Sequence, residues 1–156
     1  MKKLLTLSLL TLSLVAIAQE RIALVIGNAD YQINPLTNAL NDAQDIAKAL
    51  EGLDFKVTLI ENGNKRVMKD AIYDFSEKLN KDSVGLFYYA GHAVQYHGEN
   101  YLIPINALPE IKKIRHLEDE AVRSGIVSKE MELSQSQLNF IFLDACRDNP
   151  LPSDSR

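Results

Sequence analysis

The chain has 156 residues, of which 46% are hydrophobic and 24% charged, and its formal net charge is −4 at pH 7. This length suits one compact globular domain. The acidic balance argues against nucleic acid and anionic membranes as main partners.

Residues 1–18 have the pattern of a secretory signal peptide. Lys2 and Lys3 form a basic start, Leu4 to Ile17 carries no charge, and Ala16-Ile17-Ala18 is a small-x-small cleavage site. A membrane anchor is the alternative, but this apolar stretch is shorter than the roughly 18 to 20 residues that span a bilayer. We expect an exported protein, periplasmic or secreted, whose mature form comprises residues 19–156 and has no membrane partner.

Four apolar runs predict the strands of a mostly parallel central sheet. They are Arg21–Gly27, Phe55–Ile60, Val84–Ala90 and Leu138–Leu143, of which the first and the fourth are expected to be buried. Apolar residues recur at helical spacing in Ala43–Leu50, which Gly52 should end, in Met68–Leu79, and more weakly in Leu117–Leu133. Because strands alternate with helices, the sequence predicts an α/β fold, a three-layer α/β/α sandwich with right-handed crossovers.

Three segments after the third strand lack these patterns. Gly91–Asn100 is expected to be a polar loop, and Ala107–Arg115 a basic loop. Tyr101–Pro104 is expected to be a short edge segment, because Pro104 is poorly suited to a central strand.

The α/β layout is also compatible with nucleotide binding. The turn after the first strand reads Gly27-Asn-Ala-Asp-Tyr31, which is neither a G-x-G-x-x-G motif nor a Walker loop. We therefore do not expect a phosphate site there.

A thiol and an imidazole follow two of the predicted strands. Cys146, the only cysteine, comes directly after the fourth strand, and His92 comes after the third. Open α/β sheets carry their chemistry at the carboxyl ends of the strands, and a cysteine nucleophile needs an acid/base partner there. The alternatives are a buried, inert cysteine and a structural histidine. His97 and His116 are rival acid/base candidates, but both lie in polar stretches.

Several motifs occur in the order and spacing of a known family. They are Val25-Ile-Gly-Asn28, Asn41-Asp-Ala43, Tyr89-Ala-Gly-His92, Asn100-Tyr-Leu-Ile-Pro104 and Asp144-Ala-Cys-Arg-Asp-Asn-Pro150. His92 precedes Cys146 by about 50 residues, as in caspases. On these motifs, residues 21–150 resemble the caspase-like cysteine peptidases, above all the bacterial metacaspase and paracaspase branch.

The resemblance implies a caspase-like fold and a cysteine endopeptidase acting on proteins or peptides. Cys146 would be the nucleophile, His92 the acid/base, and the backbone N–H groups of Ala93 and Cys146 the oxyanion hole. Asp42 and Asp144 match the acids that line the pocket for the residue before the cut bond. Two partly buried carboxylates there would favour Arg or Lys. This chemistry requires no metal or organic cofactor.

The chain departs from the family pattern in three respects. Ala93 stands where the family usually has glycine, and Ala90 where many relatives have serine. Family members also continue beyond the cysteine motif with two more strands, whereas this chain ends at Arg156. We therefore expect residues 19–156 to be the large-subunit portion of the catalytic domain. The alternative is a weakly active or inactive binding module that needs a second subunit or self-association, with the open sheet edge as its pairing surface.

Three further interpretations remain. Glu118-Asp-Glu120 resembles an acidic patch where some metacaspases bind calcium, but acids at a helix start more often interact with the helix dipole. Lys112, Lys113 and Arg115 are expected to be solvated, or alternatively to form a processing site. A thiol redox protein is the least favoured function, because no C-x-x-C motif or resolving cysteine is present.

Overall fold

The computed structural model describes residues 19–145. Its main sheet has four parallel strands in the order β2-β1-β3-β7. They are β1 (Glu20–Gly27), β2 (Lys56–Glu61), β3 (Ser83–Ala90) and β7 (Leu138–Asp144). All four predicted strands are therefore confirmed. The predicted signal peptide, residues 1–18, and Cys146 lie outside the described residues.

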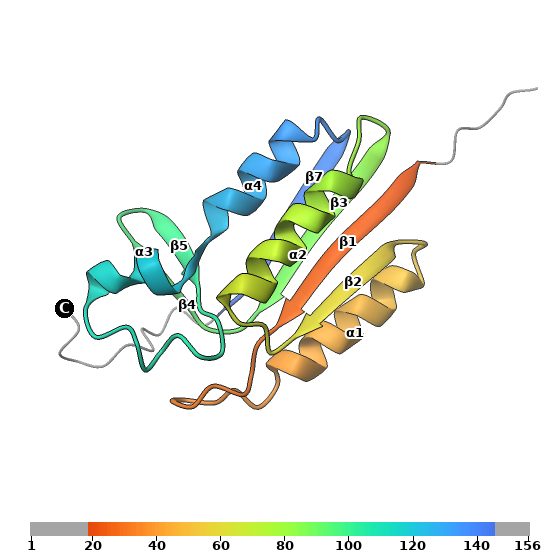
Figure 1. The fold of residues 1–156 in the computed structure, drawn as a ribbon. Helices are drawn as coiled ribbons and strands as arrows, with labels where there is room; N and C mark the ends of the chain where they lie inside the picture. Colours follow the sequence, from red (N-terminus) through yellow and green to blue (C-terminus); the bar gives the residue numbers. More distant parts are fainter. Residues whose placement is uncertain (1–18, 146–156) are drawn as a thin grey trace, which may run out of the picture.

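Helices cover both faces of this sheet, which confirms the three-layer α/β/α arrangement (Figure 1). Helix α1 (Ala39–Glu51) packs on one face and ends at Gly52, as predicted. Helices α2 (Lys65–Lys78) and α4 (Ser124–Leu133) pack on the other face.

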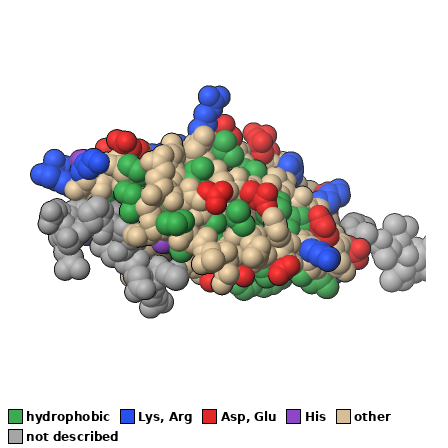
Figure 2. Space-filling view, turned by 90° about the horizontal axis from the view of Figure 1, so that it is seen from below, with side chains coloured by type: hydrophobic (Ala, Val, Ile, Leu, Met, Phe, Trp, Pro, Cys, Tyr) green, Lys and Arg blue, Asp and Glu red, His purple; other side chains and the backbone are tan. Residues whose placement is uncertain are grey.

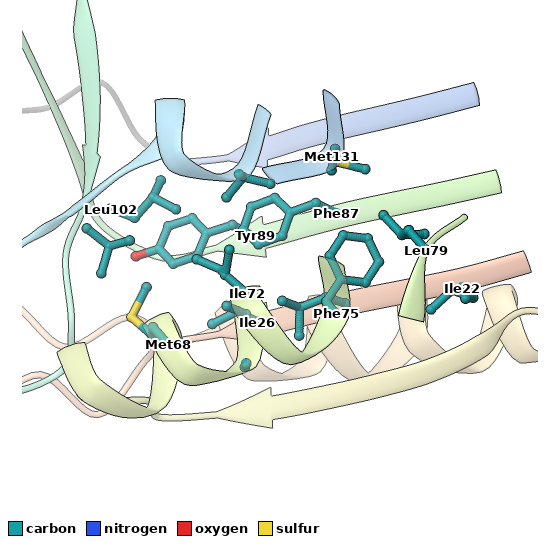
Figure 3. Close-up of a cluster of buried hydrophobic side chains, with 14 residues drawn as sticks. Ile22, Ile26, Met68, Ile72, Phe75, Leu79, Phe87, Tyr89, Leu102 and Met131 are labelled. Carbon is teal, nitrogen blue, oxygen red and sulfur yellow. The ribbon is translucent and has the colours of Figure 1, made fainter. Parts of the chain in front are cut away.

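The larger part of the core lies between the sheet and α2 with α4. Alternate residues of a strand point to the same face, so Ile22, Leu24 and Ile26 of β1 face α2 together. Phe75 of α2 and Tyr89 of β3 complete this cluster, in which Tyr89 runs toward the carboxyl ends of the strands (Figure 3). The opposite faces of β1 and β3 pack against the small residues of α1.

A second, antiparallel sheet lies beyond the carboxyl ends of the main strands (Figure 1). It consists of β4 (Ala93–Tyr96), β5 (Glu99–Leu102) and β6 (Val122–Arg123) in the order β4-β5-β6. The prediction of a polar loop over Gly91–Asn100 is wrong. His97 and Gly98 both have positive φ, 49° and 80°, which is the geometry of a two-residue hairpin turn. The dipeptide Asn-Gly would have indicated a β-hairpin turn, but here histidine occupies the first turn position, so the sequence contains no such indication.

The predicted helix over Leu117–Leu133 is also wrong as a single element. The structure has a 3₁₀ turn, η1 (Ile114–His116), a short α3 (Leu117–Glu120), the strand β6 and then α4. The break occurs because Val122 pairs with Leu102 of β5 in extended conformation.

The segment Ala107–Ile114 is a loop up to the start of η1, largely as predicted, but three of its apolar side chains are buried. Ala107, Leu108 and Ile111 join Tyr31 in a third apolar cluster beside the small sheet. The basic side chains of Lys112, Lys113 and Arg115 lie outside this cluster, and both lysines are exposed.

The prediction that the fourth strand is buried is wrong. β7 pairs only with β3 among the described strands, and Phe140 and Phe142 are 39% and 48% exposed. In register they lie beside Leu86 and Tyr88, on the face that α1 covers only in part. Their rings stack with centroids 6.2 Å apart. No helix within residues 19–145 is long and apolar enough to cross a membrane.

Candidate functional site

The ends of β3 and β7 bring the two motifs of the predicted dyad to one place. Ala90 and Asp144 are register partners, and the Gly91 N–H donates to the Asp144 carbonyl oxygen at 3.3 Å. His92 is the second residue after Ala90, and Cys146 is the second residue after Asp144. Neighbouring strands lie about 4.8 Å apart. Cys146 itself lies outside the described residues.

The imidazole of His92 is 6% exposed and is held in one orientation. Its Nε2 atom lies 2.6 Å from the carbonyl oxygen of Asn34. A carbonyl can only accept, so Nε2 carries a proton, and Nδ1 is the nitrogen that can act as a base. Nδ1 is buried and has no hydrogen-bond partner among the described residues. His92 therefore offers a proton acceptor at the sheet edge.

The N–H of Ala93 is free of the hairpin ladder. Ala93 pairs with Leu102, and the Ile103 N–H donates to the His92 carbonyl oxygen immediately beside this pair. In an antiparallel ladder a bond of this kind flanks a pair that is not itself hydrogen bonded. The Ala93 N–H thus points away from β5, and it is available to a ligand beside His92.

The hydroxyl of Tyr88 bonds to Asp144, and the charge of Asp42 also acts on it. Tyr88 Oη donates to Asp144 Oδ2 at 3.0 Å, and Asp42 lies in the first turn of α1. Burial raises the pKa of Tyr88, and the hydrogen bond to Asp144 and the charges of Asp144 and Asp42 raise it further. The phenol therefore stays protonated and remains a donor. Both carboxylates are exposed, so the prediction that they are partly buried is wrong.

The two rival histidines occupy other parts of the molecule. His97 is exposed at the turn of the β4–β5 hairpin. His116 ends η1, where its Nδ1 lies 3.3 Å from the Glu110 carbonyl oxygen. Neither lies at the ends of β3 and β7.

Three contributors to the site were missed by sequence reasoning. Asn34 acts through a backbone oxygen, for which no sequence signal exists. Tyr31 contacts His92, with ring centroids 4.5 Å apart. Tyr88 could have been found from strand alternation, since residues 88 and 144 lie near the ends of neighbouring strands on one face.

No three His, Cys, Asp or Glu side chains within the described residues are grouped as metal ligands would be. The acids Glu118, Asp119 and Glu120 form the first turn of α3, and Lys65 Nζ donates to the carbonyl oxygen of Asp119.

Figure 2 shows acidic side chains among hydrophobic ones over the middle of one face, with Lys and Arg side chains toward its margins.

Comparison with known proteins gives consistent matches. The model of the family described as "Caspase domain" matches residues 20–156. Human mucosa-associated lymphoid tissue lymphoma translocation protein 1 and its mouse homolog are each 32% identical to the chain over 132 residues. These 132 residues are 84% of this chain and 15% of each relative, so the chain spans a small part of the relatives' length.

A crystal structure of a protein from Geobacter sulfurreducens has a similar fold. The TM-score is 0.62 at 16% sequence identity, and the match covers 81% of this chain and 50% of the other. At this identity the likeness concerns the fold alone.

Proposed function

Because the chain belongs to the caspase domain family, a family of cysteine peptidases, we propose that it is itself an active endopeptidase that cuts proteins after Arg or Lys. Cys146 is the nucleophile and His92 the acid/base in this proposal. Residues 1–18 direct export, so that the enzyme acts in the periplasm or outside the cell. A mature protein that begins at Gln19 when recovered from outside the cytoplasm would support export, and retention of Met1 would contradict it.

The reaction follows from the orientation of His92. The Cys146 thiol passes its proton to Nδ1 as sulfur attacks the peptide carbonyl carbon. The negative charge that forms on the carbonyl oxygen is held by the N–H groups of Ala93 and Cys146. The imidazolium then donates its proton to the leaving amine, and a thioester remains on Cys146. A water molecule, deprotonated by Nδ1, attacks the thioester and releases the acid product and the thiol.

The observation that carries this proposal is the pairing of Ala90 with Asp144. It gives His92 and Cys146 the same offset beyond two adjacent strand ends. Cys146→Ala and His92→Ala should each abolish cleavage of an Arg-containing peptide, while His97→Ala and His116→Ala serve as matched controls and should leave it unchanged. Cleavage that survives in Cys146→Ala refutes the assignment.

The preference for Arg or Lys rests on Asp42 and Asp144. Asp144 accepts from the hydroxyl of Tyr88, and the charges of Asp144 and Asp42 both raise the pKa of that hydroxyl, which supports a shared acidic environment at the carboxyl end of β7. Because they are exposed, the attraction to a cation is coulombic and screened by salt. Bidentate pairing favours Arg over Lys.

A peptide library tests this preference directly. Asp42→Ala should weaken cleavage of basic substrates and leave alkylation of Cys146 by iodoacetamide unchanged. Asp45→Ala, which removes an exposed acid of the same helix, is the matched control. A wild-type preference for Asp would overturn the specificity while leaving the Cys–His chemistry intact.

A second candidate function is a binding module of low intrinsic activity that requires a partner. The exposed strand β7 favours it, because Phe140 and Phe142 lie on its surface and its outer edge is unpaired within the described residues. A second copy or another subunit that adds a strand there would cover both. Sedimentation velocity should then show concentration-dependent association that Phe140→Thr weakens, whereas Tyr73→Thr, on exposed α2 surface, does not. A monomer with full turnover excludes this candidate.

A further inference from the structure

Two buried tyrosine hydroxyls bond to the main chain of His92, one to its N–H and one to its carbonyl oxygen. The His92 N–H donates to Tyr31 Oη at 3.0 Å. Tyr89 Oη donates to the His92 carbonyl oxygen at 2.8 Å. The two hydroxyl oxygens are 3.3 Å apart, and the two side chains are 3% and 0% exposed. Both polar groups of the His92 peptide backbone thus bond to this pair, and the carbonyl oxygen accepts in addition from the Ile103 N–H.

The hydroxyl pair is itself anchored. Tyr31 Oη donates to the Ile103 carbonyl oxygen at 2.9 Å, and Asn28 Nδ2 donates to the same oxygen at 3.2 Å. Asn28 is wholly buried and also accepts from the Gly63 N–H at 2.8 Å. The anchor therefore joins the end of β1, the loop before α2 and the end of β5. Groups bound on all sides in this way have little freedom to move.

Tyr31 also contacts the reacting ring. Its ring centroid lies 4.5 Å from that of His92, with an angle of 52° between the planes. Asn34, whose carbonyl oxygen accepts from Nε2, is in the same loop, three residues after Tyr31. One loop thus supplies the backbone contact, the ring contact and the acceptor that selects the tautomer.

We propose that Tyr31 is a positioning residue for His92: its hydroxyl fixes the His92 backbone so that Nε2 stays on Asn34 and Nδ1 faces the reaction. Tyr89 is the second anchor. The inference rests on the proposed peptidase function for its catalytic meaning, but the control of the His92 ring by Tyr31 can be measured without any activity.

The kinetic test compares Tyr31→Phe with the wild-type protein on an Arg peptide. Phenylalanine keeps the ring contact and removes only the hydroxyl. We expect kcat to fall about 10- to 100-fold, because a small misplacement of a catalytic group has this effect, with KM within about twofold. Tyr101→Phe is the matched control: Tyr101 is equally buried and in the same cluster as Tyr31, and among the described residues no hydrogen bond or ring contact joins its side chain to His92. It should leave kcat unchanged.

The second readout is the ¹⁵N spectrum of the histidine rings at about pH 8.5, two units above the ordinary imidazole pKa. The His92 signals, assigned from their absence in His92→Asn, should show one tautomer with the proton on Nε2 in the wild type. In Tyr31→Phe they should move toward the average of two tautomers, because the ring is no longer held on Asn34.

These readouts separate the inference from the proposed function. If the wild type cleaves no peptide, the peptidase proposal fails, and the ring spectrum alone decides whether Tyr31 positions His92. An unchanged tautomer in Tyr31→Phe overturns the inference, even if kcat falls, because the loss then does not act through the ring. Should Tyr31→Phe not fold, Tyr89→Phe is tested in the same way and must shift the tautomer in the same direction.

Discussion

The carbonyl oxygen of Asn34 accepts a hydrogen bond from His92 Nε2 at 2.6 Å, and Asn34 has a left-handed backbone with φ of 54°. The direction of this oxygen therefore depends on a conformation that asparagine and glycine tolerate and that β-branched residues avoid.

This geometry predicts different outcomes for two substitutions of Asn34. Asn34→Gly should keep the loop conformation and near-normal turnover. Asn34→Val should shift the loop out of the left-handed region and lower kcat on the order of tenfold, because the acceptor for Nε2 is misplaced. Steady-state kinetics on one Arg peptide measures both. Equal activity in the two variants would show that the carbonyl plays no part.

Tyr88 gives a prediction about specificity. Tyr88→Phe removes the donor that holds the Asp144 carboxylate, so that carboxylate should sample more rotamers. We expect KM for Arg peptides to rise by several fold, with kcat little changed, since an interaction made in both ground and transition states is weakened. The alkylation rate of Cys146 by iodoacetamide should stay the same. An unchanged KM would mean that Asp144 is positioned without Tyr88.

The strand ends of the site could be predicted because apolar runs and helical periodicity are strong signals. These patterns alone place His92 and Asp144 at the carboxyl edge of the sheet. The exposure of β7 could not be predicted in this way, because a run such as Asn139–Leu143 reads alike for a central strand and for an edge strand.

The environment of His92 was beyond sequence reasoning for a different reason. The acceptor of Nε2 is a backbone oxygen, whose direction is a matter of φ and ψ at Asn34 and not of residue type. Tyr31 reaches His92 only because the loop after β1 folds back over the end of β3, where Asn28 N–H donates to the Ala90 carbonyl oxygen. Such contacts depend on tertiary structure alone.

Gly91 gives a prediction about stability. A Cβ atom at this position would lie 2.6 Å from Tyr89 Oη and 2.8 Å from Tyr31 Oη. Both hydroxyls are buried and hydrogen bonded, so they cannot move aside without losing partners. Gly91→Ala should therefore lower the free energy of unfolding by about 1–3 kcal/mol in urea titration. Gly52→Ala, at the end of α1 with φ of −63°, is the control and should change it by less than about 1 kcal/mol. Equal stability of Gly91→Ala and the wild type would contradict the tight packing of the hydroxyl pair.

The buried hydroxyls also predict how stability depends on pH. Burial raises the pKa of Tyr31 and holds the pKa of Tyr89 well above its ordinary value, about 10. As pH rises through 10, the unfolded chain releases these protons while the folded protein keeps them, so the unfolded state is favoured.

The free energy of unfolding should therefore keep the full contribution of these tyrosines below about pH 10. Above this pH it should fall on the order of 1 kcal/mol per pH unit for each such tyrosine. Tyr89→Phe removes one of these protons. The free energy of unfolding of this variant should therefore fall less steeply between about pH 9.5 and 11, by the same amount per pH unit, whatever its value at neutral pH. Ile72→Val, which removes a buried methylene from the same core, lowers stability by about 1 kcal/mol but carries no proton, so its decline should run parallel to the wild type. Urea unfolding at a series of pH values measures all three slopes. Parallel slopes for Tyr89→Phe and the wild type would show that the Tyr89 hydroxyl ionises as readily in the folded protein as in the unfolded chain. That result would contradict the rigid, buried hydroxyl pair beside His92.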